Sequence, residues 1–117
     1  MNTYIKDVEF YKGVTIIRLI GNIKLANLKS VQDEYREKMK DRTVKNILFD
    51  LKEVDDVDSS GLAVLVDLLR YMKTHQAGDE IGLINVSQKM KDLLSISKTE
   101  KIFHEYPSEE IAINELK

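Results

Sequence analysis

Hydrophobic and polar positions change their spacing several times along the chain, and each change predicts a different element. In the segment 4–10 apolar and polar residues alternate loosely, and a second run, 14–20, is rich in β-branched residues. Two such runs joined by a short turn predict a β-hairpin. Gly21 and Asn22 then break the chain, and over 25–39 apolar residues recur at helical spacing between charged ones, which predicts an amphipathic helix.

The second half of the chain alternates strand-like and helix-like patterns. Short apolar runs at 44–51 and 81–86 are typical of central strands in a sheet. The first run is followed by a helical stripe over 62–72, in a helix region that closes at Gly78. After the second run, Ser87 is the expected N-cap of the next helix.

The C-terminal segment completes an order ββαβαβαβα. A weak strand is expected over 101–106, and Ser108, followed by two acidic residues, predicts the start of a final helix. Strands that alternate with helices predict an α/β fold with a mixed sheet of about five strands, an antiparallel hairpin at one edge, the rest largely parallel, and about four helices. We expect residues 1–117 to form a single domain, because this length supports one core and not two.

Composition narrows the range of partners. The chain is 43% hydrophobic, which predicts a folded domain, and its 32% charged residues sum to a net charge of only −2. No basic footprint results, so we expect no nucleic acid partner. There is no cysteine, which excludes disulfides and thiolate metal sites, and no apolar run is long enough for membrane insertion. These features predict a cytoplasmic protein.

The turn Asp58-Ser59-Ser60-Gly61 carries the most informative chemistry. It follows a predicted strand and precedes a helix, and sites in α/β sheets form at the carboxyl ends of strands. A phosphate on a hydroxyl there would be stabilised by the helix dipole and unpaired N–H groups. The simplest alternative is that Asp58 or Ser59 only caps the helix. A cap leaves Gly61 unexplained, and we interpret this glycine as opening the surface to a partner or a kinase.

This turn continues into Leu62, and Asp58-Ser59-Ser60-Gly61-Leu62 resembles the signature of the STAS-domain anti-sigma-factor antagonists. The resemblance extends over nearly the whole length and implies the STAS fold. It also implies that the first serine of the motif, Ser59, is the phosphoacceptor.

The resemblance further implies regulation of transcription by partner switching, with neither catalysis nor a cofactor in this chain. The unmodified form would bind an anti-sigma factor with serine kinase activity and release the sigma factor. Phosphorylation of Ser59 would block binding, a serine phosphatase would reverse it, and the protein would be a monomer or weak dimer.

The partner-binding surface implied by the resemblance combines the turn with the segment after the second strand. Its expected members are Asp58, Ser59, Ser60, Gly61, Leu62, Gly21, Asn22 and Lys24. Family members commonly carry Gly-Glu-Leu-Asp where this chain has Gly21-Asn22-Ile23-Lys24, so both acids are missing. The charge reversal leads to the hypothesis that Lys24 attracts a phosphate on Ser59.

Three alternatives remain open. Asp56 and Asp58 fit the Asp-x-Asp-x-Ser/Thr pattern of haloacid-dehalogenase-like, Mg²⁺-dependent phosphotransferases, but the other predicted strand ends add no further acid. A receiver-like domain would use Asp50, yet the acid pair expected after its first strand does not appear. A STAS module could also serve a transporter or a multi-protein stress-signalling complex, which changes the partner and not the fold.

Overall fold

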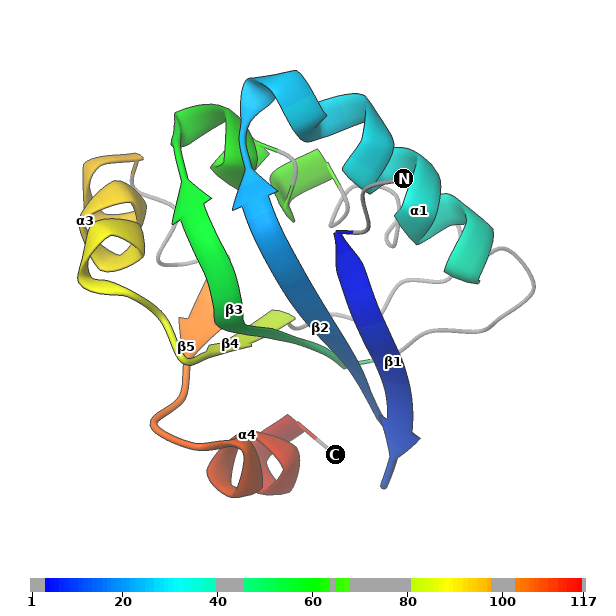
Figure 1. Cartoon of the computed structure of the whole chain (residues 1–117). Helices are drawn as coiled ribbons and strands as arrows, with labels where there is room; N and C mark the ends of the chain where they lie inside the picture. Colours follow the sequence, from blue (N-terminus) through cyan, green and yellow to red (C-terminus); the bar gives the residue numbers. More distant parts are fainter. Residues whose placement is uncertain (1–3, 40–45, 64, 68–80, 98–102, 117) are drawn as a thin grey trace.

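Five strands form one sheet in the part of the chain that the computed structural model describes, residues 4–39, 46–63, 65–67, 81–97 and 103–116 (Figure 1). They are β1 (Ile5–Tyr11), β2 (Val14–Ile23), β3 (Ile47–Val57), β4 (Ile81–Ile84) and β5 (Phe103–Glu105). Their order in the sheet is β1-β2-β3-β4-β5. The β1–β2 pair is antiparallel and the other neighbouring pairs are parallel, which confirms the predicted mixed sheet with a hairpin edge.

Helices follow strands β2 to β5 in the predicted order. They are η1 (Leu25–Asn27), α1 (Leu28–Met39), the helical residues 59–63 and 65–67, α3 (Gln88–Ser97) and α4 (Glu109–Leu116). The N-cap expected at Ser87 is confirmed, since its hydroxyl accepts from the Met90 N–H at 3.2 Å. The last helix begins after Ser108 as predicted, and the Ser108 hydroxyl accepts from the Ile111 N–H at 3.2 Å. The predicted helix end at Gly78 and the first two residues of the predicted strand 101–106 lie outside the described residues.

Strands β2 and β3 are longer than the sequence pattern predicts. Gly21 does not break the chain there, because β2 accommodates it at φ 86° and continues to Ile23. Strand β3 passes the predicted end at Leu51 and reaches Val57 through a largely polar stretch. The two extensions pair with each other, with register shifts on either side of the Ile20–Gly21 pairing. Pairing between distant segments therefore stabilises strand structure that the local pattern does not favour.

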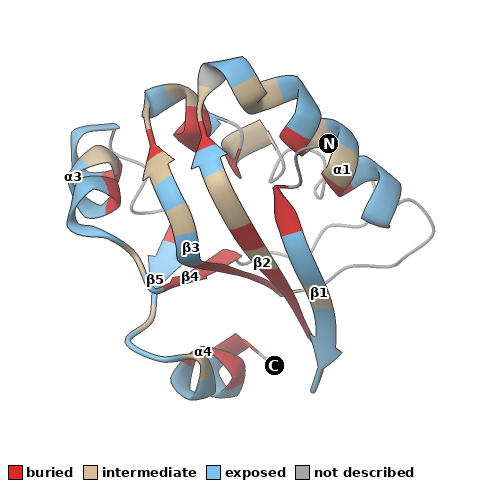
Figure 2. Ribbon diagram, viewed as in Figure 1, coloured by how far each residue is buried: buried red, intermediate tan, exposed pale blue. Residues whose placement is uncertain are grey.

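The larger core lies on one face of the sheet. Alternate residues of β2, β3 and β4 pack there against α1, the helix that begins at Ser59, and α3. Figure 2 shows the buried centre of the sheet and the mostly exposed edge strand β1. Helices fall on this face because successive parallel strands are joined by crossovers of one hand. The carboxyl ends of β2 and β3 and the helix starts after them consequently meet at one end of the sheet.

Helix α4 covers part of the opposite face (Figure 1). A smaller core cluster joins residues of β2, β3 and β4 to this helix; it consists of Val14, Ile16, Leu48, Ile84, Ala112, Ile113 and Leu116. Gly82 lies beneath the same layer, and a Cβ there would come within 3.0 Å of the side chains of Tyr106, Leu116 and Leu48. The C-terminal helix thus buries the part of the second face that β2, β3 and β4 form.

Candidate functional site

The turn after β3 is a capped helix N-terminus. Asp58 Oδ1 accepts the N–H of Gly61 at 3.0 Å and the hydroxyl of Ser60, and the Asp58 carbonyl accepts the N–H of Leu62 at 3.2 Å. Asp58 is therefore the N-cap, and the helix begins at Ser59. The hydrogen bonds from the Ser60 hydroxyl and then from the Gly61 N–H lower the pKa of the Asp58 carboxyl.

The two serines of the turn have different environments. Ser60 is half-buried and its hydroxyl donates to Asp58, whereas Ser59 is exposed at the first helical position. Of the two hydroxyls, that of Ser59 is the accessible one. It lies at the N-terminus of the helix, where the positive end of the helix dipole favours negative charge.

Gly61 has a different role from the one its sequence position indicates. The residue is buried, and a Cβ would lie 2.0 Å from the Ile23 carbonyl oxygen and 2.7 Å from Val57 Cγ2. The interpretation that Gly61 opens the surface to a partner is therefore wrong. Its missing side chain instead lets the helix N-terminus pack directly against the end of β2. Leu62 is also buried, at 4% exposure. Gly61 and Leu62 therefore pack in the interior and hold the turn in place.

The same packing brings the second predicted segment to the site. Gly61 packs against the Ile23 carbonyl, so the end of β2 lies beside the helix start at Ser59. Gly21 and Asn22 directly precede Ile23, and Lys24 directly follows it. Asn22 is exposed, and its carbonyl accepts the side-chain N–H of Asn27 at 2.7 Å. The fold thus places the two segments of the expected binding surface next to each other.

A bridged ion pair joins three elements beside this surface. Lys24 Nζ lies 2.8 Å from Asp56 Oδ2, and Lys89, at the start of α3, contacts the other oxygen of the same carboxylate. The hydrogen bond from Lys24 and then that from Lys89 lower the pKa of Asp56, and the bond to Asp56 raises that of Lys24. A contact between Lys24 and a phosphate on Ser59 stays a prediction.

The sequence pattern did not indicate Lys89 as part of the site, and it assigned Asp56 to the phosphotransferase alternative and not to the partner-binding surface. The sequence position that could have indicated Lys89 is its place shortly after the carboxyl end of β4, because β4 is the strand adjacent to β3.

The geometry disfavours the phosphotransferase and the receiver-like alternatives. Both carboxylate oxygens of Asp56 bind ammonium groups and Oδ1 of Asp58 caps a helix, so these acids already serve other partners. Among the described residues no cluster of three or more potential metal ligands occurs. Asp50 is buried and binds Arg18 and Asn85, which does not suit a receiver-type phosphoacceptor.

Comparison with known proteins identifies the family. The family model of the STAS domain matches residues 6–112. An anti-sigma F factor antagonist of Paenibacillus polymyxa is 32% identical over 110 residues, which are 94% of this chain and 92% of that protein. The chain belongs to the STAS domain family.

Solved structures agree with this STAS fold. A candidate anti-sigma factor antagonist from Thermotoga maritima matches with a TM-score of 0.80 at 19% identity, over 94% of this chain and 92% of that one. The anti-sigma factor antagonist SpoIIAA in its unphosphorylated form matches with a TM-score of 0.72 at 18% identity, over 93% of both chains. The phosphorylated form of SpoIIAA from Bacillus matches with a TM-score of 0.67 at 19% identity, over 95% of this chain and 98% of that one. Among the described residues of this STAS domain, no helix has the length and apolar character needed to cross a membrane.

Proposed function

We propose that this STAS domain is an anti-sigma-factor antagonist that regulates transcription by partner switching. In its unmodified form it binds an anti-sigma factor that has serine kinase activity, and the sigma factor is released. Phosphorylation of Ser59 ends this binding, and a serine phosphatase restores it. The chain acts in the cytoplasm as one domain, a monomer or weak dimer, and catalyses no reaction itself.

The exposed hydroxyl of Ser59 is the observation that carries this proposal. Asp58 holds the helix start and the hydroxyl of Ser60, which leaves Ser59 as the hydroxyl of the motif that a kinase can reach. The relative named as an anti-sigma F factor antagonist, similar over almost the whole chain, supports the same class of partner.

Charge accounts for the switch. A phosphate on Ser59 adds about −1.5 to −2 charges at neutral pH. In the free protein the helix N-terminus and water stabilise it, while Asp58 and Asp56 repel it, so the fold tolerates the modification. A protein interface over the same turn would have to desolvate the dianion, which costs several kcal/mol per ion unless a cation compensates it. Binding is therefore lost although the fold is kept.

The test replaces Ser59 and uses its neighbour as the control. Tagged wild-type protein recovers the anti-sigma factor from the cells that make it, and calorimetry with the purified partner then measures affinity. We expect Ser59→Ala to bind as wild type and Ser59→Asp to lose at least about 1.4 kcal/mol, a tenfold change. With ATP, the partner should phosphorylate wild type and Ser60→Ala but not Ser59→Ala, as read by mass spectrometry.

Two results would contradict the proposal. One is equal affinity of Ser59→Ala and Ser59→Asp for the partner. The other is a phosphate found on Ser60 or elsewhere while Ser59 stays unmodified.

A further inference from the structure

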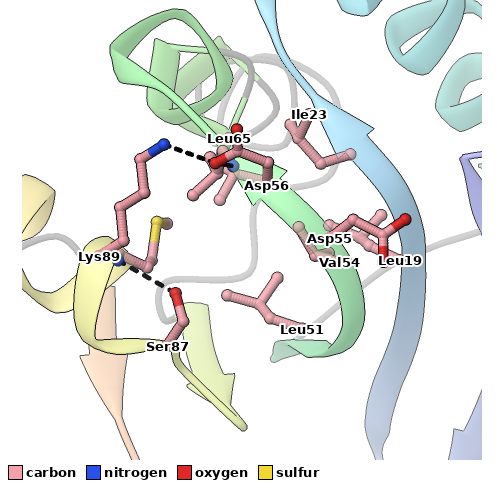
Figure 3. Close-up of a pocket in the computed structure, with 11 residues that line it drawn as sticks. Leu19, Ile23, Leu51, Val54, Asp55, Asp56, Leu65, Ser87 and Lys89 are labelled. Carbon is pink, nitrogen blue, oxygen red and sulfur yellow. Dashed lines mark hydrogen bonds and ion pairs between the residues drawn. The ribbon is translucent and has the colours of Figure 1, made fainter.

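An apolar cavity opens at the carboxyl end of the sheet, between β3, the helix that begins at Ser59, and α3 (Figure 3). Its volume is about 150 Å³. The walls are formed largely by aliphatic side chains and one methionine, namely Leu19, Ile23, Leu51, Val54, Val57, Leu65 and Met90. An apolar space of this size holds one six-membered ring, as benzene fills an engineered protein cavity of the same volume.

The cavity is a local exception in a tightly packed molecule. At Gly61 and at Gly82 there is no room for one additional methyl group, because neighbouring atoms lie within 3.0 Å of the place where a Cβ would be. Native interiors contain few voids larger than a water molecule. An unfilled space lined by seven apolar side chains therefore suits an occupant from outside the chain.

The rim of the cavity is polar and accessible. The Lys89–Asp56 ion pair spans it, with side chains 58% and 32% exposed, and Ser87 lies beside it at the start of α3 (Figure 3). Asp55 also borders the cavity, but its carboxylate points away from the space. An apolar interior with a polar rim is the arrangement found where a partner inserts a hot-spot side chain.

The cavity adjoins the proposed switch. Val57 forms part of its wall, and the next two residues along the chain are Asp58 and Ser59. Val57 also lies against Gly61, so one side chain separates the cavity from the first helical turn. A protein that covers the exposed Ser59 hydroxyl reaches the rim without leaving this end of the sheet.

We propose that this cavity is an anchor pocket that receives one aromatic or branched aliphatic side chain of the protein that binds the Ser59 turn. The proposal rests on the proposed function and specifies how its partner is held. A protein side chain is favoured over a free metabolite because the polar side chains at the rim are engaged with other groups, Lys89 with Asp56 and Ser87 with the Met90 N–H, while the rest of the wall is apolar. The pocket also continues the surface on which the switch acts. Burial of one such side chain contributes affinity that does not depend on the charge of Ser59.

The pocket is tested by filling it from its own wall. Val54→Phe adds a ring inside the cavity, and Val8→Phe, a half-buried valine on β1 outside it, is the matched control. With unmodified protein we expect Val54→Phe to weaken partner binding by roughly tenfold or more and Val8→Phe to change it by less than about twofold. Thermal unfolding shows whether both variants are folded.

Benzene provides a probe that needs neither the partner nor phosphorylation. We expect saturable NMR shift changes at Val54 and Leu65 in wild type and in Val8→Phe, and none at Leu65 in Val54→Phe. Saturating benzene should also weaken partner binding to wild type. This measurement tests the anchor pocket even if Val54→Phe does not fold. Absence of benzene binding at these residues would overturn the anchor pocket.

The outcomes separate this inference from the proposed function. If Ser59→Asp loses the partner while a folded Val54→Phe binds it as wild type, only the anchor pocket is wrong. Binding of benzene without any effect on partner affinity has the same meaning and assigns the cavity to a small apolar molecule instead. If Ser59→Asp binds as wild type, the switch itself fails, whatever benzene shows.

Discussion

At the scale of single residues, Gly61 couples the switch turn to the neighbouring strand. A Cβ on Gly61 would lie 2.0 Å from the Ile23 carbonyl oxygen, so no larger residue fits without moving either the helix start or the end of β2. The position of Ser59 therefore depends on an internal contact made by a residue two places later. Family signatures that contain glycine next to a reactive group can in this way reflect packing and not access.

We predict that Gly61→Ala destabilises the protein by about 1–3 kcal/mol, the range for overpacking a filled interior. Urea unfolding measures the change. Ser59→Ala in the same helical turn is the control and should stay within about 0.5 kcal/mol of wild type, because Ser59 is exposed. A Gly61→Ala protein as stable as wild type would show that the turn can move away from Ile23.

At the scale of elements, Arg18 connects its own strand β2 to three other elements on the α4 side of the sheet. Its guanidinium lies 3.2 Å from Glu9 of β1, 2.7 Å from Asp50 of β3 and 2.8 Å from Glu109 of α4. The hydrogen bond to Glu109 is the largest influence that raises the pKa of Arg18.

The carboxyl of Asp50 in this cluster has a lowered pKa. Burial alone would raise the pKa of Asp50, but hydrogen bonds from Asn85, the Lys52 N–H and Arg18 together lower it.

This cluster predicts a stability change in acid. Because the pKa of Asp50 lies below its ordinary value of 3.8, its stabilising contribution is complete above that pH and is lost as the pH falls through the folded-state value. We expect Asp50→Asn to be less stable than wild type by about 1–3 kcal/mol at neutral pH. The difference should shrink in acid. Urea unfolding at a series of pH values checks this, and a difference that stays constant in acid would contradict it.

At the scale of the whole molecule, the two faces of the sheet have separate tasks. The switch turn and the anchor pocket lie on the face covered by α1, the Ser59 helix and α3, and α4 covers part of the other face through its own small core. Stability contributed by α4 is therefore expected to be independent of partner binding.

Two isoleucines of α4 test this separation. Ile113 is 6% exposed in the smaller core cluster, whereas Ile111 on the same helix is 45% exposed. We predict that Ile113→Ala lowers the free energy of unfolding by about 2 kcal/mol and that Ile111→Ala changes it by less than about 0.5 kcal/mol. Both folded variants should bind the partner as wild type in calorimetry. Loss of affinity in Ile113→Ala below its melting temperature would show that the two faces are coupled.

Much of the architecture was predictable from the chain itself. The hairpin, the alternation of strands and helices and the caps at Ser87 and Ser108 depend on residue spacing and on hydrogen bonds within a few residues. The segment from Asp58 to Leu62 was likewise recognisable as a motif, and its capping carboxylate follows from the preference of Asp for helix starts.

The sequence by itself therefore determined the order of elements, the family and the turn that carries the candidate serine. Only the tertiary structure decided how far β2 and β3 extend, why position 61 is glycine, and that Asp56 joins Lys24 to Lys89 beside an apolar cavity. These features arise from pairing between strands and from packing between side chains that are distant in sequence. Such contacts depend on three-dimensional arrangement, and no local pattern of hydrophobic and polar residues contains it.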